Sequence, residues 1–337
     1  MHKEFEDCPL TNRAVITGCG SFVPPSVLTN EDLARKVDTS DEWITTRTGI
    51  KSRHITTDGE TTAYLATEAA KRALAYAHVN GEDLELISVA TITPEMVFPS
   101  TACFVQQALG ATKAWVFDLA AACSGFVYSL HLVQQMIHNG RLNKALVIGA
   151  ETLTKITNWK DRSSCILFGD GAGAVVLERK DNAGRGILYS TLGADGTYWE
   201  SLNCRAHGSR NPVSRPLGDP DMVYMQIKGR EVYQQAVRRI VDAVTDCMSH
   251  CGLTIDDVAM VISHQMNARI IESAAKRLEL PPEKVFVNIQ NYGNTSAASV
   301  PIAFDECMRQ GKLKKGDIVI FVAFGAGVTW GANIIEI

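Results

Sequence analysis

The chain has 337 residues, of which 46% are hydrophobic and 21% are charged, and its formal net charge is −4. This composition is typical of a globular protein with about two compact units of roughly 150 residues each. It excludes a disordered chain, a collagen-like repeat and a small disulfide scaffold. The slightly negative charge argues against nucleic acid as the main partner.

No segment of the sequence indicates secretion or a membrane anchor. The longest apolar run, 318–328, is too short to cross a bilayer, and residues 1–7 contain no apolar core of a signal peptide. The chain has nine cysteines, an odd number, and none are spaced as a Cys-x-x-Cys pair. We therefore expect a cytoplasmic protein with reduced thiols and no membrane partner.

Apolar patterns of two periods alternate along the chain. Residues 29–32 have the capping chemistry that opens a short helix. Continuous apolar runs, typical of strands covered on both faces of a sheet, alternate with helical spacing, which is clearest after Lys228. The sequence therefore predicts an α/β fold. The strands are expected at 84–91, 114–119, 145–150, 174–177, 258–262 and 317–324.

Other segments bear on function by what they add or exclude. The stretch 198–222 is rich in proline, glycine and serine, and we expect a long excursion there, either a cap over a pocket or a mobile loop. Glycine clusters at 18–20 and 169–173 do not make a dinucleotide-binding fingerprint, because neither is followed by a helix. Two prolines follow the first cluster, and a predicted strand follows the second.

A weak internal repeat indicates that the two halves are copies of one strand–helix unit. With Cys123 set against Asn294, an offset of 171 residues, a glycine-led basic segment aligns in both halves, and 115–116 falls on 286–287. Each of these pairs is predicted to lead by a strand into a turn of small residues. We expect the two turns, one with a thiol and one with an amide, to face each other. Chance similarity between α/β segments is the alternative.

Cys123 has the position of a catalytic nucleophile. It follows the strand predicted at 114–119 through three alanines and precedes a helix expected to begin near Ser124. The positive end of a helix macrodipole lowers the pKa of a thiol from about 8.5 and favours the reactive thiolate. The alternative is a buried structural cysteine, and we interpret the other eight cysteines in that way.

Three more segments could complete a catalytic site. His264 directly follows the strand predicted at 258–262, where open α/β sheets place ligands; a satisfied structural histidine is the alternative. Asn294 precedes a helical pattern and is either a functional amide or a helix cap. The glycine-rich segment 324–331 either places a backbone N–H beside a reacting carbonyl, as an oxyanion hole requires, or is a close-packed strand turn.

Together these segments resemble the 3-oxoacyl-[acyl-carrier-protein] synthase III family over nearly the whole chain. The resemblance implies a thiolase-like duplicated fold, with similar halves at 1–181 and 182–337 in a layered α-β-α-β-α architecture. It also implies a Cys-His-Asn triad of Cys123, His264 and Asn294, with no metal and no cofactor. The motifs that carry the resemblance lie at 38–50, 120–123, 168–173, 264–267, 293–299 and 324–331.

The resemblance further implies an acyltransferase that starts type II fatty-acid synthesis. Cys123 would attack an acyl-CoA primer, most simply acetyl-CoA, while the backbone N–H groups of Cys123 and Ala326 hold the oxyanion. A malonyl-carrier protein would then lose CO2, and the Nε2–H of His264 with the Asn294 amide would stabilise the enolate. Attack of this carbanion on the acyl group, in a narrow and dry tunnel, would give a 3-oxoacyl-carrier protein.

Coenzyme A recognition carries over from the same motifs. Trp43 is expected to offer a flat face to the adenine, Arg47 a cation to phosphate, and Arg162 a stack on the other adenine face. Thr39 and Asn267 complete the expected coenzyme A contacts. An ordinary surface pair is the alternative interpretation of Trp43 and Arg47.

The resemblance also implies two protein partners. Arg269, Lys276 and Arg277 follow His264 on one predicted helix and would steer an acidic acyl carrier protein, or form an ordinary solvated face. Phe168 is expected in the acyl pocket, and Phe98 in the acyl pocket of the partner in a homodimer. The chain departs from the family pattern at Met266, where alanine is common, at Ala326, where glycine is usual, and in its long 198–222 excursion.

Three other functions remain open. The nearest is a related ketosynthase that uses a longer or branched primer or acts in secondary metabolism. A cysteine hydrolase also uses Cys-His-Asn, but Trp43 and Arg47 would have no role in hydrolysis. A non-catalytic acyl-binding subunit would have no reason to keep all three triad residues.

Overall fold

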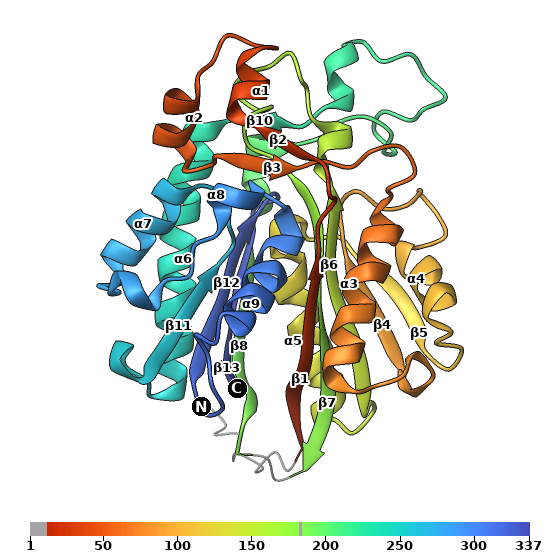
Figure 1. Ribbon diagram of the computed structural model, residues 1–337, viewed down its shortest axis with the longest axis vertical. Coiled ribbons are helices and arrows are strands. Elements are labelled where there is room, and N and C mark those ends of the chain that lie inside the picture. Colours follow the sequence, from red (N-terminus) through yellow and green to blue (C-terminus); the bar gives the residue numbers. More distant parts are fainter. Residues whose placement is uncertain (1–11, 182–183) are drawn as a thin grey trace.

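The computed structural model describes residues 12–181 and 184–337. No helix within those ranges is long and apolar enough to span a membrane. Two mixed β-sheets alternate with three layers of helices (Figure 1). The predicted α/β class and α-β-α-β-α layering are confirmed.

The first sheet has the strand order β1-β7-β6-β4-β5. β4 pairs in parallel with β5 and β6, whereas β7 runs antiparallel to β1 and β6. β4 is buried along its whole length, which accounts for its uninterrupted apolar sequence. The bounds are β1 Asn12–Phe22, β4 Leu86–Ala90, β5 Trp115–Leu119, β6 Lys144–Thr152 and β7 Asp170–Asp181.

The second sheet has the strand order β11-β12-β13-β8, with only β11 and β12 parallel. Two short strand pairs, β2 with β3 and β9 with β10, lie outside the main sheets. The main strands are β8 Gly186–Ala194, β11 Val258–Ser263, β12 Ile318–Gly325 and β13 Thr329–Glu336. The short strands are β2 Val27–Thr29, β3 Ser52–His54, β9 Leu202–Asn203 and β10 Gln226–Ile227.

Helices cover both outer faces of the sheets and fill the space between them (Figure 1). α5 (Gly125–His138) and α9 (Ser299–Arg309) lie between the sheets. α3 and α4 cover the first sheet from outside, and α6, with α7 beside it, covers the second. The remaining bounds are α1 Asn30–Ala34, α2 Asp41–Thr48, α3 Thr62–Ala77, α4 Thr101–Leu109, α6 Gly229–Cys251, α7 Ala268–Arg277 and α8 Ile289–Tyr292.

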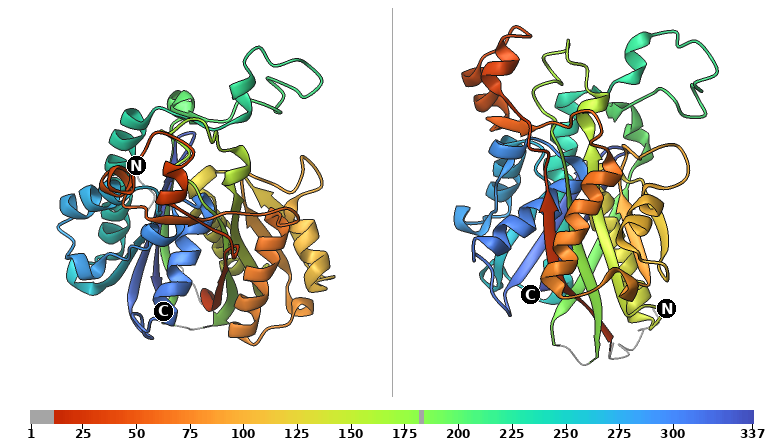
Figure 2. Two further views of the ribbon diagram at one scale, coloured as in Figure 1. Left: turned by 45° about the horizontal axis from the view of Figure 1, so that its top comes forward. Right: turned by 45° about the vertical axis from the view of Figure 1, so that its right-hand side comes forward.

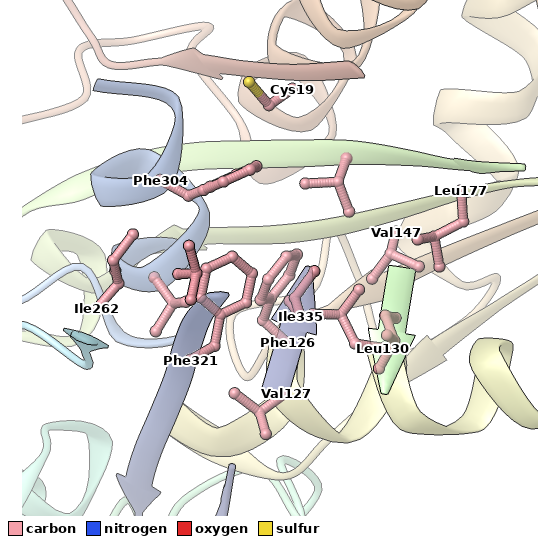
Figure 3. Packing of buried hydrophobic residues seen from close by; sticks show 14 of the residues in the cluster. Cys19, Phe126, Val127, Leu130, Val147, Leu177, Ile262, Phe304, Phe321 and Ile335 are labelled. Atoms are coloured by element: carbon pink, nitrogen blue, oxygen red, sulfur yellow. The ribbon is translucent and has the colours of Figure 1, made fainter. Parts of the chain in front are cut away.

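The main core lies between the two sheets, around α5 and α9 (Figure 3). Phe321 of β12 contacts Phe126 of α5 at 6.4 Å and Phe304 of α9 at 5.1 Å between ring centroids. All three rings are almost fully buried. Burial of that much aromatic surface holds both central helices, and therefore the turns that precede them, in fixed positions.

The structure corrects the expected offset of the internal repeat. The 3-10 turns η1 (Gly81–Asp83) and η6 (Ile255–Asp257) are 174 residues apart, as are η2 (Ala122–Ser124) and η8 (Ser296–Ala298). α5 and α9 begin at the same separation, but α9 has 11 residues against 14 in α5. The offset of 171 therefore holds only beyond the helices. Asn294 is consequently not the counterpart of Cys123, whose place in the second half belongs to Ala297.

Most predicted strands lie within one or two residues of the observed ones, and the helix expected at 29–32 begins with a full capping box at Thr29. The strand expected at 286–287 is wrong. That segment forms only an isolated bridge between Val285 and Val261, because α8 follows within a few residues and ends the extended backbone. Residues 198–222 project from the end of the molecule that carries α1 and α2 (Figure 2).

Candidate active site

Cys123 lies in η2, the turn between β5 and α5. Ala122 before it has a φ of 48°, a left-handed conformation that residues with a side chain seldom adopt, and the backbone turns sharply there. Only 7% of Cys123 is exposed, and the residue lines two cavities. The turn thus presents an almost buried thiol at the start of α5.

The prediction of a lowered thiol pKa is wrong. Burial raises the pKa of Cys123 to about 12; a hydrogen bond from Ser296 opposes this rise, and the charge of Glu151 adds to it. Desolvation outweighs the helix macrodipole because the thiol sits in a nearly closed space, where the charged form is strongly disfavoured. The thiol therefore predominates, and it must lose its proton as it reacts.

His264 directly follows β11, and its backbone N–H donates to the carbonyl of Val322 at 2.7 Å. Nδ1 lies 2.6 Å from Ser299 Oγ at the start of α9. Nε2 is buried without a hydrogen-bond partner among the described residues, beside the smaller of the two cavities. Burial lowers the pKa of His264 to about 3, so the imidazole is neutral. An unpaired ring nitrogen at a cavity is suited to a ligand.

Ser299 determines which ring nitrogen of His264 carries the proton. Its hydroxyl has one hydrogen and two nearby acceptors, His264 Nδ1 and the carbonyl of Ser296 at 2.8 Å. When Ser299 donates to Nδ1, Nε2 keeps its N–H and can donate to an oxyanion. When Ser299 donates to Ser296, Nδ1 carries the hydrogen and Nε2 is an acceptor. The Nε2–H form of the predicted mechanism therefore depends on this hydroxyl.

Asn294 is held by a tight local turn. Gly293 has a φ of 65°, and a Cβ there would lie 2.9 Å from the carbonyl of Leu167, so the position requires glycine. Asn294 Oδ1 accepts a hydrogen bond from the Ser296 N–H at 2.9 Å, as in an Asx turn. The Nδ2 amide hydrogens are the part left for a ligand in the smaller cavity. Asn294 therefore combines both interpretations, a turn former and a donor.

Two cavities meet at Cys123, Phe168 and Leu202. The larger has a volume of about 530 Å³ and the smaller about 110 Å³. Residues of the 198–222 excursion cover the larger cavity. Its other linings include Ile92, Thr93, Pro94, Ala122, Ile156, Met225, Ser296 and Ala326. The smaller cavity is lined by His264, Met266, Asn267, Ile270, Asn294, Phe324 and Gly325, among others.

The turn between β12 and β13 packs directly against the nucleophile. A Cβ on Gly325 would lie 2.8 Å from the backbone nitrogen of Cys123 and 3.0 Å from that of Ser124. Thr329 Oγ1 fixes the turn by donating to the carbonyl of Ala121 at 3.0 Å. Ala326 lines the larger cavity with Cys123. The segment is therefore a close-packed strand turn that also brings its backbone to the thiol.

Trp43, Arg47 and Arg162 lie together at the surface, on α2 and the loop after β6. The guanidinium carbons of Arg47 and Arg162 are 4.6 and 5.2 Å from the centre of the Trp43 ring. Arg162 also donates to Asp38, at 2.9 Å to its carbonyl and 3.2 Å to its carboxylate. A planar ligand between Trp43 and Arg162 requires about 7 Å, twice the van der Waals contact distance, so Arg162 must move by roughly 2 Å to admit one.

Two further residues join this surface to the smaller cavity. Asn267 caps the N-terminus of α7 and donates from Nδ2 to the carbonyl of Arg47 at 3.1 Å, while lining the cavity that contains His264. The half-buried Thr39 has a hydroxyl without a partner among the described residues. The predicted coenzyme A residues thus form a continuous path from Trp43 toward Cys123.

Comparisons with known proteins identify the family. Residues 117–196 match the 3-oxoacyl-[acyl-carrier-protein] synthase III family, and residues 248–337 match its C-terminal part. A beta-ketoacyl-[acyl-carrier-protein] synthase III from Caldanaerobacter subterraneus is 54% identical, over 96% of this chain and 97% of the relative. The chain belongs to the 3-oxoacyl-[acyl-carrier-protein] synthase III family. Its members are acyltransferases of the condensing-enzyme class with the thiolase fold.

Solved structures agree with this assignment. The 3-oxoacyl-[acyl-carrier-protein] synthase III of Aquifex aeolicus is 46% identical, superposes with a TM-score of 0.90, and covers 96% of this chain and 100% of its own. The priming beta-ketosynthase of a polyketide biosynthetic pathway is 32% identical with the same TM-score, over 96% of each chain. One synthase III fold therefore serves relatives with different biosynthetic roles.

The structure separates the remaining predicted residues of this synthase III into two groups. Phe168 is buried and lines both cavities, whereas Phe98 is 82% exposed and lies outside the cavities that contain Cys123. Arg269, Lys276 and Arg277 are exposed on α7, and Arg269 Nε donates to the carbonyl of Thr46 at 3.0 Å. Phe98 can therefore reach an acyl pocket only across an interface between two chains.

Sequence reasoning missed three polar residues of the site, Glu151, Ser296 and Ser299. Glu151 ends the strand predicted at 145–150, and a carboxylate directly after an apolar run was the available signal. Ser296 and Ser299 lie within the asparagine motif, but their spacing alone does not distinguish hydroxyls that contact other site residues from small residues that only permit close packing.

Proposed function

We propose that this chain condenses an acyl-CoA primer, most simply acetyl-CoA, with malonyl-acyl carrier protein to give a 3-oxoacyl-carrier protein, CO2 and coenzyme A. The observation that carries the proposal is the meeting of two cavities at the Cys123 thiol. The smaller holds a neutral imidazole with an unpaired Nε2 and a free amide, His264 and Asn294. One cavity suits the acyl chain and the other the two thioester arms in turn.

Acyl transfer comes first in this mechanism. The sulfur of Cys123 attacks the primer thioester, and the backbone N–H groups of Cys123 and Ala326 stabilise the tetrahedral oxyanion. Coenzyme A leaves as its thiolate, and the acyl group occupies the larger cavity. The proximity of Gly325 to the Cys123 nitrogen supports this assignment, because any side chain there would disturb that donor.

Condensation follows when malonyl-carrier protein enters by the smaller cavity. Loss of CO2 leaves an enolate whose oxygen accepts hydrogen bonds from His264 Nε2–H and Asn294 Nδ2. Neutral donors suit this step, because a group with a pKa of about 3 carries no proton that the carbanion could capture. The carbanion then attacks the acyl thioester and releases the Cys123 sulfur. A cavity lined mainly by apolar residues limits quenching by water.

The binding residues have matching roles in the proposal. Trp43 and Arg162 sandwich the adenine, Arg47 contacts phosphate, and Thr39 and Asn267 hold the pantetheine side. Arg162 keeps an acceptor, Asp38, that anchors it beside the open slot. No cofactor is required, since acyl-CoA is itself a substrate.

Exposed side chains support the proposed protein partners. Arg269, Lys276 and Arg277 present a basic face near the cavity mouth for the acidic carrier protein. Met96, Val97 and Phe98 are large apolar side chains in water, as expected of a surface buried in a homodimer. We propose that Phe98 of one subunit enters the acyl pocket of the other, and that the enzyme works in the cytoplasm.

Intact-mass labelling tests the proposed activity. Incubation with acetyl-CoA is expected to add one acetyl group at Cys123 with release of coenzyme A, and malonyl-carrier protein is then expected to discharge it as a 3-oxoacyl product. The Cys307→Ala variant, which lacks a buried thiol outside the cavities, is the matched control. Discharge only as free acid would indicate a hydrolase, and no labelling by short, branched or medium acyl-CoAs would refute the enzymatic proposal.

The size of the larger cavity favours a second candidate, a longer or branched primer. An acetyl group, about the volume of two waters at ~30 Å³ each, fills only a small part of about 530 Å³. A Phe98 side chain from a partner would reduce this space. Phe98→Ala is therefore expected to shift labelling toward longer acyl-CoAs, whereas Val97→Ala, equally exposed, should not. An unchanged primer preference in Phe98→Ala would refute this role.

A further inference from the structure

Glu151 is a fully buried carboxylate that the mechanism above does not use. It ends β6, and its oxygens accept hydrogen bonds from the loop after β4: from Thr93 Oγ1 at 2.6 Å, Thr91 Oγ1 at 3.2 Å and the Ile92 N–H at 3.2 Å. Its salt-bridge partners within the described residues number none. A buried carboxylate without a cation is costly, so its presence calls for a reason.

Ser296 connects this carboxylate to the nucleophile. Its hydroxyl donates to Glu151 Oε1 at 3.0 Å, and the same side chain hydrogen-bonds the Cys123 sulfur. Since a serine hydroxyl has one hydrogen, which here goes to the carboxylate, its oxygen is free to accept the hydrogen of the thiol. Ser296 holds this place with a φ of 48°, an unfavourable conformation of the kind found at functional sites.

His264 is poorly suited to take the thiol proton. Its Nε2–H is needed as a donor in condensation, and in that form it has no free lone pair there. Burial also lowers the pKa of His264 to about 3, whereas burial raises the pKa of Glu151 to about 7. The carboxylate is therefore the better proton acceptor of the two near neutral pH.

We propose that Glu151, acting through Ser296, takes the proton of Cys123 during acyl transfer and returns it during condensation. As the sulfur attacks the thioester, its S–H bond breaks, a proton passes to the Ser296 oxygen, and the Ser296 proton passes to Glu151 Oε1. Coenzyme A leaves as a thiolate and is protonated by solvent. When condensation expels the Cys123 thiolate, the two protons move back, so Glu151 again becomes a carboxylate. This inference rests on the proposed condensing activity.

The groups that face Glu151 make its titration legible. They are Thr91, Thr93 and the Ile92 N–H from the loop after β4, Ser296 from η8, and Cys123 from η2. Of these, only Cys123 titrates. A pH profile of acyl transfer therefore reports the carboxylate and the thiol.

The test measures the first-order rate of coenzyme A release from acetyl-CoA in a single turnover, between pH 5.5 and 10. The unsubstituted chain is expected to accelerate through a pKa near 7 and then level. Glu151→Gln and Ser296→Ala should lose about 100-fold or more at pH 7, lack that inflection, and recover tenfold per pH unit as hydroxide forms the thiolate directly. Glu151→Asp should restore the inflection in part.

A purely structural role predicts a different result. It would lower the rate by one factor at every pH, or leave both rate and inflection unchanged, and either outcome overturns the relay. Asp170→Asn is the matched control, because Asp170 is also a buried carboxylate held by threonines but contacts Thr56 and Thr154 instead of Ser296. Its profile should keep the inflection. Failure of the unsubstituted chain to release coenzyme A would overturn the proposed function itself.

Discussion

A single added methyl group at Gly325 should separate the chemistry from the fold. The Cβ of Gly325→Ala would lie 2.8 Å from the Cys123 nitrogen, and ordinary contact requires at least 3.4 Å, so this nitrogen must retreat by about 0.6 Å. A hydrogen bond from it to an oxyanion would lengthen from about 2.9 to about 3.5 Å, beyond the useful range. Loss of one oxyanion donor costs about 2.7–4 kcal/mol, or a factor of ~100–1,000 in rate.

Two measurements test this reasoning together. Coenzyme A release from acetyl-CoA in a single turnover should fall by at least ~100-fold, while urea unfolding should show a loss of about 1–3 kcal/mol from overpacking. Gly196→Ala is the control, since nothing lies within 4 Å of a Cβ there and its φ is compatible with alanine. If Gly325→Ala released coenzyme A within threefold of the unsubstituted chain, the backbone of Cys123 would not be the oxyanion donor.

Other variants address the remaining steps. His264→Ala and Asn294→Ala should keep most acyl transfer but lose condensation by a factor of ~100–1,000; equal survival of both steps in a malonyl-carrier protein assay would contradict their assignment. Ser299→Ala, which releases Nδ1, should slow condensation about tenfold with little effect on primer labelling; slower labelling would contradict this. Arg162→Ala should raise the KM for acetyl-CoA several-fold at constant kcat, with Lys160→Ala unchanged as the control; a lower kcat would contradict a binding role.

Acid stability follows from the buried imidazole. Because the folded pKa of His264 is about 3 and the unfolded value about 6.5, the unfolded state binds more protons between these limits. Stability is therefore complete above pH 6.5 and is lost as the pH falls toward 3, by up to ~1.4 kcal/mol per unit. His264→Asn should show a shallower loss in urea unfolding between pH 7 and 5. An identical slope in both proteins would contradict the buried, neutral assignment.

The predictable part of the molecule was the part set by local pattern. β4 and β12 were recognisable because apolar strands buried on both faces leave continuous apolar runs. The family motifs supplied Cys123, His264 and Asn294, and the structure places all three at one junction.

What the sequence could not supply depends on contacts between distant segments. The pKa of Cys123 was predicted in the wrong direction because a helix terminus is visible in a sequence whereas burial is not. The hydrogen bond of Ser296 to Glu151 joins residues 145 positions apart. The repeat was aligned on the wrong offset because the shorter α9 is compensated by a longer loop after it, so one aligned glycine pair hid the shift at the turns.

The packing of η2 against η8 brings the N-termini of α5 and α9 to one seam. Both ends carry partial positive charge from unpaired backbone N–H groups, so the seam favours an anion without a lysine or arginine. Fields from buried dipoles are screened little by dissolved salt, whereas the exposed Arg269, Lys276 and Arg277 are screened within about 10 Å at 0.1 M. Ionic strength should therefore weaken capture of the carrier protein while leaving the bond-making steps almost untouched.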